Sequence, residues 1–190
     1  MKLPLEFYLR SDVVEVSREL LGKVLCSNQN SQITKAIITE TEAYAGINDK
    51  ASHAYGGRRT KRTEPMYWQG GTAYVYLCYG IHHLFNVVVG DADVPLAILI
   101  RAAEPMEGID VMRQRRKKPG TGKLHLAGPG TLSQALGIRT EHTGTSLLED
   151  GIWIEDQQIP VRPQHITVGP RIGVGYAEED ANRPYRFRIV

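Results

Sequence analysis

The most informative pattern of hydrophobic and polar residues in this chain lies between positions 34 and 46. The apolar pair 37–38 is followed by the β-branched residues Thr39 and Thr41, a composition that favours a β-strand. Because side chains alternate between the two sides of a strand, Glu40, Glu42 and Tyr44 share one side. Two carboxylates and an aromatic ring at the end of a buried strand suggest a site for chemistry. A solvated strand edge with two ordinary surface acids is the alternative interpretation.

The same reasoning predicts the other elements of secondary structure. A stripe of Met106, Ile109 and Met112 predicts a helix that opens at Glu104. Segment 160–170 contains three prolines and is expected to be irregular. Helices are also expected over 12–21 and 132–136, and strands over 23–27, 33–41, 73–79, 85–90, 96–102, 151–155 and 185–190.

Strands 73–79 and 85–90 predict a hairpin with an unusual tip. Hairpin tips are normally polar, yet this one carries Tyr79 and Ile81, followed by His82 and His83. Such a tip can pack on another element, meet a protein partner, or insert between stacked bases, where wedges are typically apolar or aromatic. From the residues alone, packing on another element is the first expectation.

Length and composition narrow the class of protein. A chain of 190 residues with 42% hydrophobic residues suggests a single domain over residues 1–190. Neither a signal-peptide pattern nor a run of about 18 apolar residues occurs, so we expect a cytoplasmic protein without a membrane span. Cys26 and Cys78 lie in apolar runs and are expected to be reduced core thiols.

Charge is distributed unevenly although the net charge is only +2. Residues 54–126 contain 11 Lys or Arg against 6 Asp or Glu, whereas residues 141–180 contain 2 against 8. The basic middle fits a face that binds a polyanion, and it also fits an ordinary patchy surface. Within it, the loop 58–62 follows two glycines, which lets backbone N–H groups approach phosphates; a solvated loop is the alternative.

The motifs of several enzyme classes are missing. The chain has no dinucleotide-binding or P-loop glycine motif, no zinc protease or zinc deaminase motif, and no serine nucleophile elbow. Arg101 ends the apolar strand 96–102, and a buried arginine needs an anionic partner, for which Glu42 is a candidate. The chain thus combines a strand-end carboxylate, an arginine, several tyrosines and basic loops. This combination fits a protein that binds a polyanion and uses a general base beside an aromatic pocket. We expect no cofactor and no metal.

Taken together, several segments resemble the alkyladenine (3-methyladenine) DNA glycosylases of the mammalian type. Their order and spacing match from Leu5 to Phe187. The matching segments are Glu40–Tyr44, His53 with Gly56–Arg58, Tyr74–Gly80, Asn86, Leu99–Pro105 and Arg171–Gly175. The resemblance implies a single α+β domain with a curved antiparallel β-sheet, flanking helices and a protruding β-hairpin that intercalates into DNA.

The resemblance also implies the catalytic residues. Glu42 would be the general base that activates a water for attack on the sugar C1′, and the carboxylate would stabilise an oxocarbenium-like transition state. Arg101 and the main-chain carbonyl of Ile172 would hold the same water. Arg101 would also keep Glu42 charged at neutral pH. Glu40 would be structural.

Substrate-binding roles follow from the same resemblance. Tyr44 would stack on one face of the flipped base, and His53 and Tyr76 would cover the other face. Asn86 would crowd the exocyclic amine of guanine and so exclude it. The expected DNA contacts are Tyr79 and Ile81 as the intercalating tip, and Arg58, Arg59, Thr60, Lys61 and Arg62 along the backbone.

The implied function is a monofunctional DNA glycosylase of base excision repair, acting on alkylated purines in double-stranded DNA. We expect a monomer, located with the nucleoid or in the nucleus according to the type of cell. No lysine lies in the pocket motifs, so no Schiff base is expected. No residue is suited to protonate a neutral leaving base, which makes hypoxanthine a less secure substrate than a cationic alkylpurine. A non-enzymatic module that binds damaged DNA is the alternative.

Overall fold

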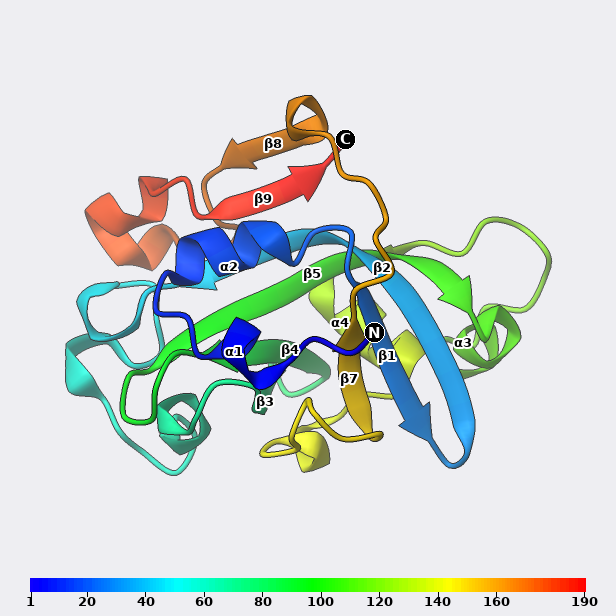
Figure 1. Ribbon diagram of the computed structural model, residues 1–190, viewed down its shortest axis with the longest axis horizontal. Coiled ribbons are helices and arrows are strands. Elements are labelled where there is room, and N and C mark those ends of the chain that lie inside the picture. The colour runs from blue at the N-terminus through cyan, green and yellow to red at the C-terminus, as the bar shows by residue number, and fades with distance from the viewer.

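A computed structural model describes all 190 residues and shows one antiparallel sheet that curls around the core (Figure 1). The central strands run in the order β3-β4-β5-β2-β1-β7, while β6 pairs with β5, and β9 pairs with both β2 and β8. The strands are β1 Val24–Gln29, β2 Gln32–Tyr44, β3 Ala73–Cys78, β4 His82–Val89, β5 Leu96–Glu107, β6 Leu126–Ala127, β7 Ile152–Glu155, β8 Ile166–Gly169 and β9 Arg186–Ile189. The curved antiparallel α+β architecture implied by the resemblance is confirmed.

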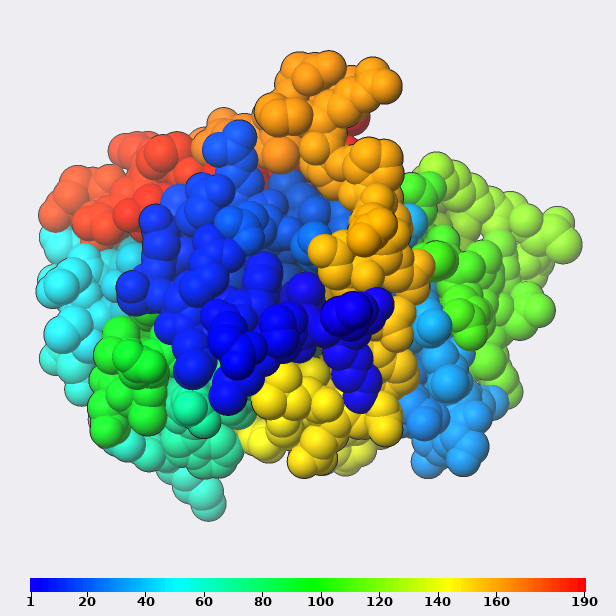
Figure 2. All heavy atoms as spheres, in the orientation of Figure 1, coloured from blue at the N-terminus to red at the C-terminus, as the bar shows by residue number.

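Four short helices pack on this sheet. Helix α2 lies against β2 and β5, and α4 lies against β4 and β5. The N-terminal segment, with α1 and α2, covers the middle of the face seen in Figure 2, beside the segment near residue 160. The α-helices are α1 Leu5–Tyr8, α2 Val13–Glu19, α3 Ile109–Arg115 and α4 Pro129–Leu136, and the 3-10 helices are η1 Gly46–Asn48, η2 Tyr55–Gly57, η3 Glu64–Tyr67, η4 Thr140–His142, η5 Pro163–His165 and η6 Gly175–Asn182.

Local signals placed the start of α2 correctly. The side chain of Asp12 accepts a hydrogen bond from the Glu15 N–H, which satisfies one of the free donors of the first turn. Val16 and Leu20, within the range 12–21 predicted as a helix, are fully buried. Burial of each such side chain contributes roughly 1.5–3 kcal/mol, so tertiary packing holds this short helix in place.

Two predicted boundaries are wrong. No helix opens at Glu104, because β5 continues to Glu107 and the helix begins only at Ile109, after Gly108 with a φ of 73°. Pairing of β5 with the long strand β2 overrides the helical stripe, of which only Met112 is buried. Segment 160–170 is also not wholly irregular, since Ile166–Gly169 form β8 against β9.

The β3–β4 hairpin ends in a tight turn at Tyr79 and Gly80. The Ile81 N–H donates to the Cys78 carbonyl, and φ is 51° at Tyr79 and 73° at Gly80. Two successive residues with positive φ are typical of a type I′ turn, which normally carries Asn-Gly. Tyr79 is 91% exposed, so its ring does not pack on another element, contrary to the first expectation.

The two cysteines differ from each other. Cys26 is a buried core thiol as predicted, and burial raises its pKa to about 12. Cys78 is only partly buried and lines a cavity, so the prediction of a core thiol is wrong for this residue. None of the helices has the length and apolar character needed to cross a membrane.

Candidate active site

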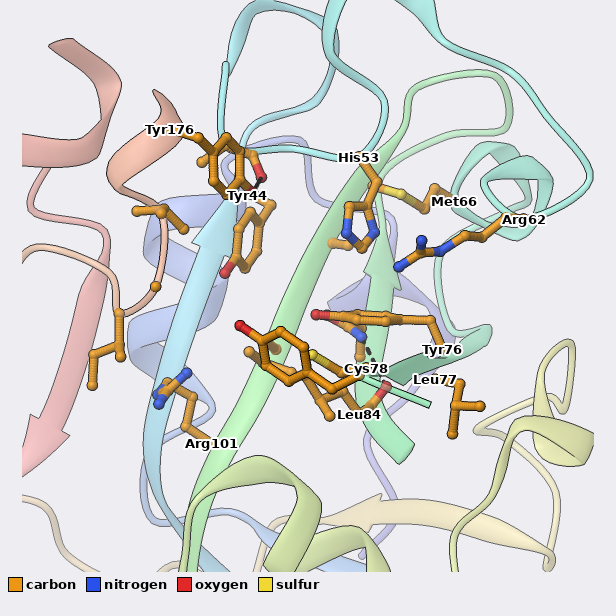
Figure 3. A pocket seen from close by; sticks show the side chains of 18 residues that line it. Tyr44, His53, Arg62, Met66, Tyr76, Leu77, Cys78, Leu84, Arg101 and Tyr176 are labelled. Atoms are coloured by element: carbon orange, nitrogen blue, oxygen red, sulfur yellow. Dashed lines mark hydrogen bonds between the residues drawn. The ribbon is translucent and has the colours of Figure 1, made fainter. Parts of the chain in front are cut away.

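A cavity of about 450 Å³ opens beside the β3–β4 hairpin (Figure 3). This volume falls in the range of pockets that bind small molecules. Its lining includes six residues that the sequence placed in one site, drawn from β2, β3, β4, β5 and two loops. These residues are Tyr44, His53, Tyr76, Asn86, Arg101 and Ile172.

Aromatic rings form two opposite walls of the cavity. Figure 3 shows Tyr44 on one side, with His53 and Tyr76 facing it from the other. The His53 and Tyr76 rings meet edge to face, with 4.7 Å between their centroids. Arg62 lies over the Tyr76 ring at 5.2 Å from its centroid. A flat ring placed between these walls would be contacted on both faces.

His53 is held as a neutral ring. Its Nδ1 lies 3.0 Å from the Tyr74 hydroxyl. Burial lowers the pKa of His53 to about 4, and the nearby Arg62 and Arg58 lower it further in the same direction. A neutral imidazole does not repel a positively charged ligand. When Tyr74 donates to Nδ1, the N–H at Nε2 is left for a ligand in the cavity.

Asn86 presents a fixed amide to the cavity. Its Nδ2 donates to the carbonyl oxygens of Tyr74 and Leu84, at 3.1 Å in both cases. Because both amide hydrogens are used within the hairpin, Oδ1 is the polar atom left for a ligand. The buried strand β4 therefore holds a hydrogen-bond acceptor in one orientation at the cavity wall.

Glu42 lies beneath the cavity and is fully buried. Its Oε1 accepts from the Ile172 N–H at 2.7 Å, and its Oε2 accepts from the Tyr44 hydroxyl at 3.0 Å. Arg101 Nη1 lies 3.4 Å from Oε2. All three donors belong to residues that line the cavity, whereas Glu42 itself does not. The hydrogen-bond partners of Glu42 therefore connect its carboxylate to the cavity wall.

Burial and hydrogen bonding act on Glu42 in opposite directions. Burial raises the pKa of Glu42 above its usual 4.5, while Arg101, the Ile172 N–H and the Tyr44 hydroxyl each oppose that rise. The expected effect of Arg101 is therefore present, but burial outweighs it. Burial and the neighbouring Glu42 raise the pKa of Tyr44 well above 10, so this hydroxyl keeps its proton and donates.

Glu40 and Glu42 have different hydrogen-bond partners. Glu40 Oε1 pairs with Arg101 Nε at 3.2 Å and with Arg186 Nη1 at 3.3 Å. Only one of these partners, Arg101, lines the cavity, whereas all three donors to Glu42 do so. Glu40 orients Arg101 by accepting a hydrogen bond from its Nε. This contact is consistent with the structural role expected for Glu40.

Ile172 is positioned by a buried ion pair. Arg171 donates through Nη2 to Asp49 Oδ1 at 2.8 Å, and through Nη1 to the Ala43 carbonyl at 2.9 Å. Its guanidinium also lies over the Tyr44 ring, 4.9 Å from the centroid. Asp49 was not identified from the sequence, because one acid in a polar loop carries no signal that it is buried. Tyr176, Met66 and Leu84 also line the cavity without a recognisable sequence signal.

The residues of the basic loop 58–62 have different surroundings. Arg59 is bound to Glu64, at 2.8 and 2.9 Å, and to Asp93, so its donors are already engaged. This pairing counts against Arg59 as a backbone contact. Arg62 lines the cavity wall, which its place in a loop did not reveal. Arg58 and Lys61 are exposed, and Thr60 bonds to Thr63 within the loop.

The remaining predicted contacts are at the hairpin tip. Tyr79 lines the mouth of the cavity, and Ile81, 70% exposed, follows it on the outer side of the turn. An exposed aromatic ring and an aliphatic side chain thus project together from the end of a two-stranded hairpin. No cluster of three or more His, Cys, Asp or Glu residues is placed to hold a metal ion.

Comparisons with known proteins relate the chain to one family. Residues 6–190 match the model of the methylpurine-DNA glycosylase family. A protein of Chlamydia felis is 47% identical over 188 residues, which cover 98% of this chain and 95% of that protein. A protein of Bacillus cereus is 44% identical over 195 residues, covering 98% and 95% of the two chains. Both relatives are provisionally assigned as 3-methyladenine DNA glycosylases.

Proposed function

The chain belongs to the methylpurine-DNA glycosylase family, and we propose that it removes alkylated purines from double-stranded DNA. As a 3-methyladenine DNA glycosylase, it is a hydrolase of N-glycosyl bonds. The observation that carries the proposal is a buried carboxylate with three donors that all line one aromatic cavity.

Glu42 acts as the general base. An ionised carboxylate offers about four acceptor positions, and Ile172, Tyr44 and Arg101 occupy three of them. The fourth position accepts a hydrogen bond from a water molecule in the cavity. The water oxygen bonds to C1′ as the C1′–N bond breaks, its proton passes to Glu42, and the bonding electrons leave with the base. The products are a free purine and an abasic site.

The negative charge of Glu42 also favours the transition state. Positive charge develops on the sugar as the base departs, and a buried carboxylate stabilises it strongly because little water screens it. Arg101 holds the carboxylate in place and, with the Ile172 main chain, positions the water. These roles need no cofactor.

The cavity walls select the base. A cationic alkylpurine stacks well on the electron-rich rings of Tyr44 and Tyr76, and neutral His53 does not repel it. The Asn86 side chain, held by two hydrogen bonds within the hairpin, would crowd the position of the exocyclic amine of guanine and so exclude guanine. The purine must leave the duplex to reach this cavity, and a damaged pair costs less to open. Tyr79 and Ile81 then fill the gap in the base stack.

The alternative is a non-enzymatic module that binds damaged DNA. Both functions use an aromatic cavity and an exposed tip, but only the enzyme needs an acid with a free acceptor position beneath the cavity. The three donors to Glu42 compensate the cost of burying its charge, and all of them line the aromatic cavity. This position of the acid, next to the place where a base would bind, favours the enzyme.

Single-turnover release of 3-methyladenine from duplex DNA tests the assignment. Glu42→Gln keeps the shape of the side chain and should slow release by roughly 10²–10⁴-fold, the range for loss of a general base, while DNA affinity remains. Glu40→Gln is the matched control and should retain release within about tenfold of wild type. Equal release by Glu42→Gln and wild type, with equal DNA binding, would show that Glu42 is not the base.

A further inference from the structure

A second hollow, of about 810 Å³, lies along the other half of the hairpin tip. Tyr79 lines the aromatic cavity, whereas Ile81, His82 and His83 line this hollow, which we call the polar groove. Its remaining walls come from the β1–β2 turn, the end of α3, α4 and the segment 137–142. The tip thus has the base cavity on one side and the polar groove on the other.

The lining of the polar groove suits an anion. Of its sixteen lining residues, two are hydrophobic and one, Glu141, is acidic. Lys117 and Arg139 are exposed, and neither side chain forms an ion pair within the protein. Arg115 is held instead by the carbonyls of Gln29 and Ala135 and forms part of the wall. Two free cations therefore face solvent along the groove.

His83 adds a neutral donor with fixed orientation to the groove. His83 Nδ1 accepts from the Thr140 N–H at 3.1 Å, so the proton of the neutral ring resides on Nε2. His142 is fixed in the same way by the Arg139 N–H at 2.8 Å, and its Nε2 lies 2.9 Å from Gln29 Oε1. These bonds connect segment 139–142 to both the hairpin and β1. The wall of the groove is therefore held in place by hydrogen bonds.

The tip itself is packed against α4 on this side. A Cβ added to Gly130 would lie 2.8–2.9 Å from atoms of the His82 side chain, so the glycine permits a close approach that a larger residue would prevent. The direction of the hairpin relative to the groove is therefore set by packing.

We propose that the polar groove binds phosphates of the undamaged DNA strand, opposite the flipped nucleotide. This inference rests on the proposed function. If the damaged strand delivers its base to the cavity and Tyr79 fills the vacancy, the complementary strand lies beyond Tyr79, on the side of Ile81 and His83. Lys117, Arg139 and the His83 Nε2–H are donors suited to phosphate oxygens there.

Binding to duplex and single-stranded DNA separates this surface from the rest of the interface. The double variant Lys117→Ala/Arg139→Ala should bind duplex DNA with an abasic-site analogue at least tenfold more weakly than wild type. Its slope of log affinity against log salt should fall by about 1.8, the value for two lost phosphate contacts. Its affinity for the single strand carrying the analogue should stay within about twofold of wild type. Both residues are exposed, so the variant should fold.

The comparator is Arg58→Ala/Lys61→Ala, in the basic loop near the base cavity. It should weaken binding to duplex and single strand alike, because it lies on the side of the damaged strand. Ethylation of individual phosphates gives a second measurement: wild type should be sensitive to ethylation at phosphates of the undamaged strand, and the groove variant should lose that sensitivity.

Two results would overturn the groove assignment. One is an unchanged duplex affinity of the groove variant, and the other is an equal loss on duplex and single strand. Base release by wild type reports separately on the proposed function. If wild type releases base from duplex DNA and either of these two results is obtained, the proposed glycosylase function stands and the groove assignment is wrong.

Discussion

Arg171 and Asp49 form a bidentate ion pair in which both side chains are completely buried. The pair joins the loop after β8 to the segment that follows β2 and η1, and so it places two donors at once. Ile172, the next residue along the chain, donates to Glu42, while the Tyr44 ring under the Arg171 guanidinium supplies the hydroxyl donor. One buried charge pair therefore supports the surroundings of the proposed base.

Asp49→Asn should weaken both folding and base release. It leaves the Arg171 charge buried without its partner, which typically costs about 3–5 kcal/mol of stability. Displacement of the Ile172 and Tyr44 donors would raise the pKa of Glu42 further, so the acid limb of the rate profile should move to higher pH. Denaturant unfolding and single-turnover rates against pH measure the two effects.

A destabilised variant remote from the cavity provides the control for Asp49→Asn. Leu25→Ala removes a fully buried core side chain on β1 and should cost about 2–5 kcal/mol. Its acid limb should coincide with that of wild type wherever the protein is folded. If Asp49→Asn and Leu25→Ala give the same pH profile, the ion pair contributes stability alone.

The rate of base release should decrease at low pH, and the decrease should be centred above the usual pKa of glutamate. Only the ionised carboxylate accepts a proton, and burial raises the pKa of Glu42 above 4.5. The rate should therefore fall as pH decreases through that raised value. Tyr44→Phe keeps the stacking ring but removes one donor, so it should move the limb to still higher pH. An acid limb that Tyr44→Phe leaves in place would contradict the pairing of Tyr44 with Glu42.

His53 should make folding stability sensitive to acid. Its pKa is about 4 in the folded protein and 6.5 when unperturbed, so protonation favours the unfolded chain. Its stabilising contribution is complete above pH 6.5 and is lost as pH falls from 6.5 to about 4. The loss amounts to roughly 3 kcal/mol, since each pKa unit corresponds to about 1.4 kcal/mol. His53→Gln should show a smaller decrease over the same range, and identical curves would contradict the shift.

Tyr79→Asn should make the protein more stable and a poorer DNA binder. Tyr79 has a φ of 51° and is almost wholly exposed, so asparagine relieves backbone strain without removing a packing contact. We expect a gain of about 1 kcal/mol in stability and a loss of roughly 1–3 kcal/mol in affinity for DNA with an abasic site. Tyr79→Ala should lose the same affinity without gaining stability. A decrease in stability for Tyr79→Asn would show that the ring packs on the protein.

Several features could be predicted from the sequence because they depend on near neighbours. The helix that begins near Asp12, the strands β1 and β2, and the shared side of Glu42 and Tyr44 follow from local geometry with known periods. The cavity residues were identified by resemblance to a family, and the structure brings them together. Errors arose where a distant strand decided the outcome, as when β2 extended β5 past Glu104 and β9 ordered residues 166–169.

The sequence by itself determined the main strands, a hairpin with an aromatic residue at its tip, and a strand that ends in Glu42 and Tyr44, and the resemblance to a family added the antiparallel α+β fold. Only the tertiary structure decided that Glu42 is fully buried and that the Ile172 N–H, 130 residues away, donates to it. It also decided that Arg59 is paired, that Cys78 lines the cavity, and that a polar groove lies behind the tip. The reason is physical: strand periodicity and turn preference act over a few residues, whereas burial, ion pairing and cavity shape depend on which distant segments pack together.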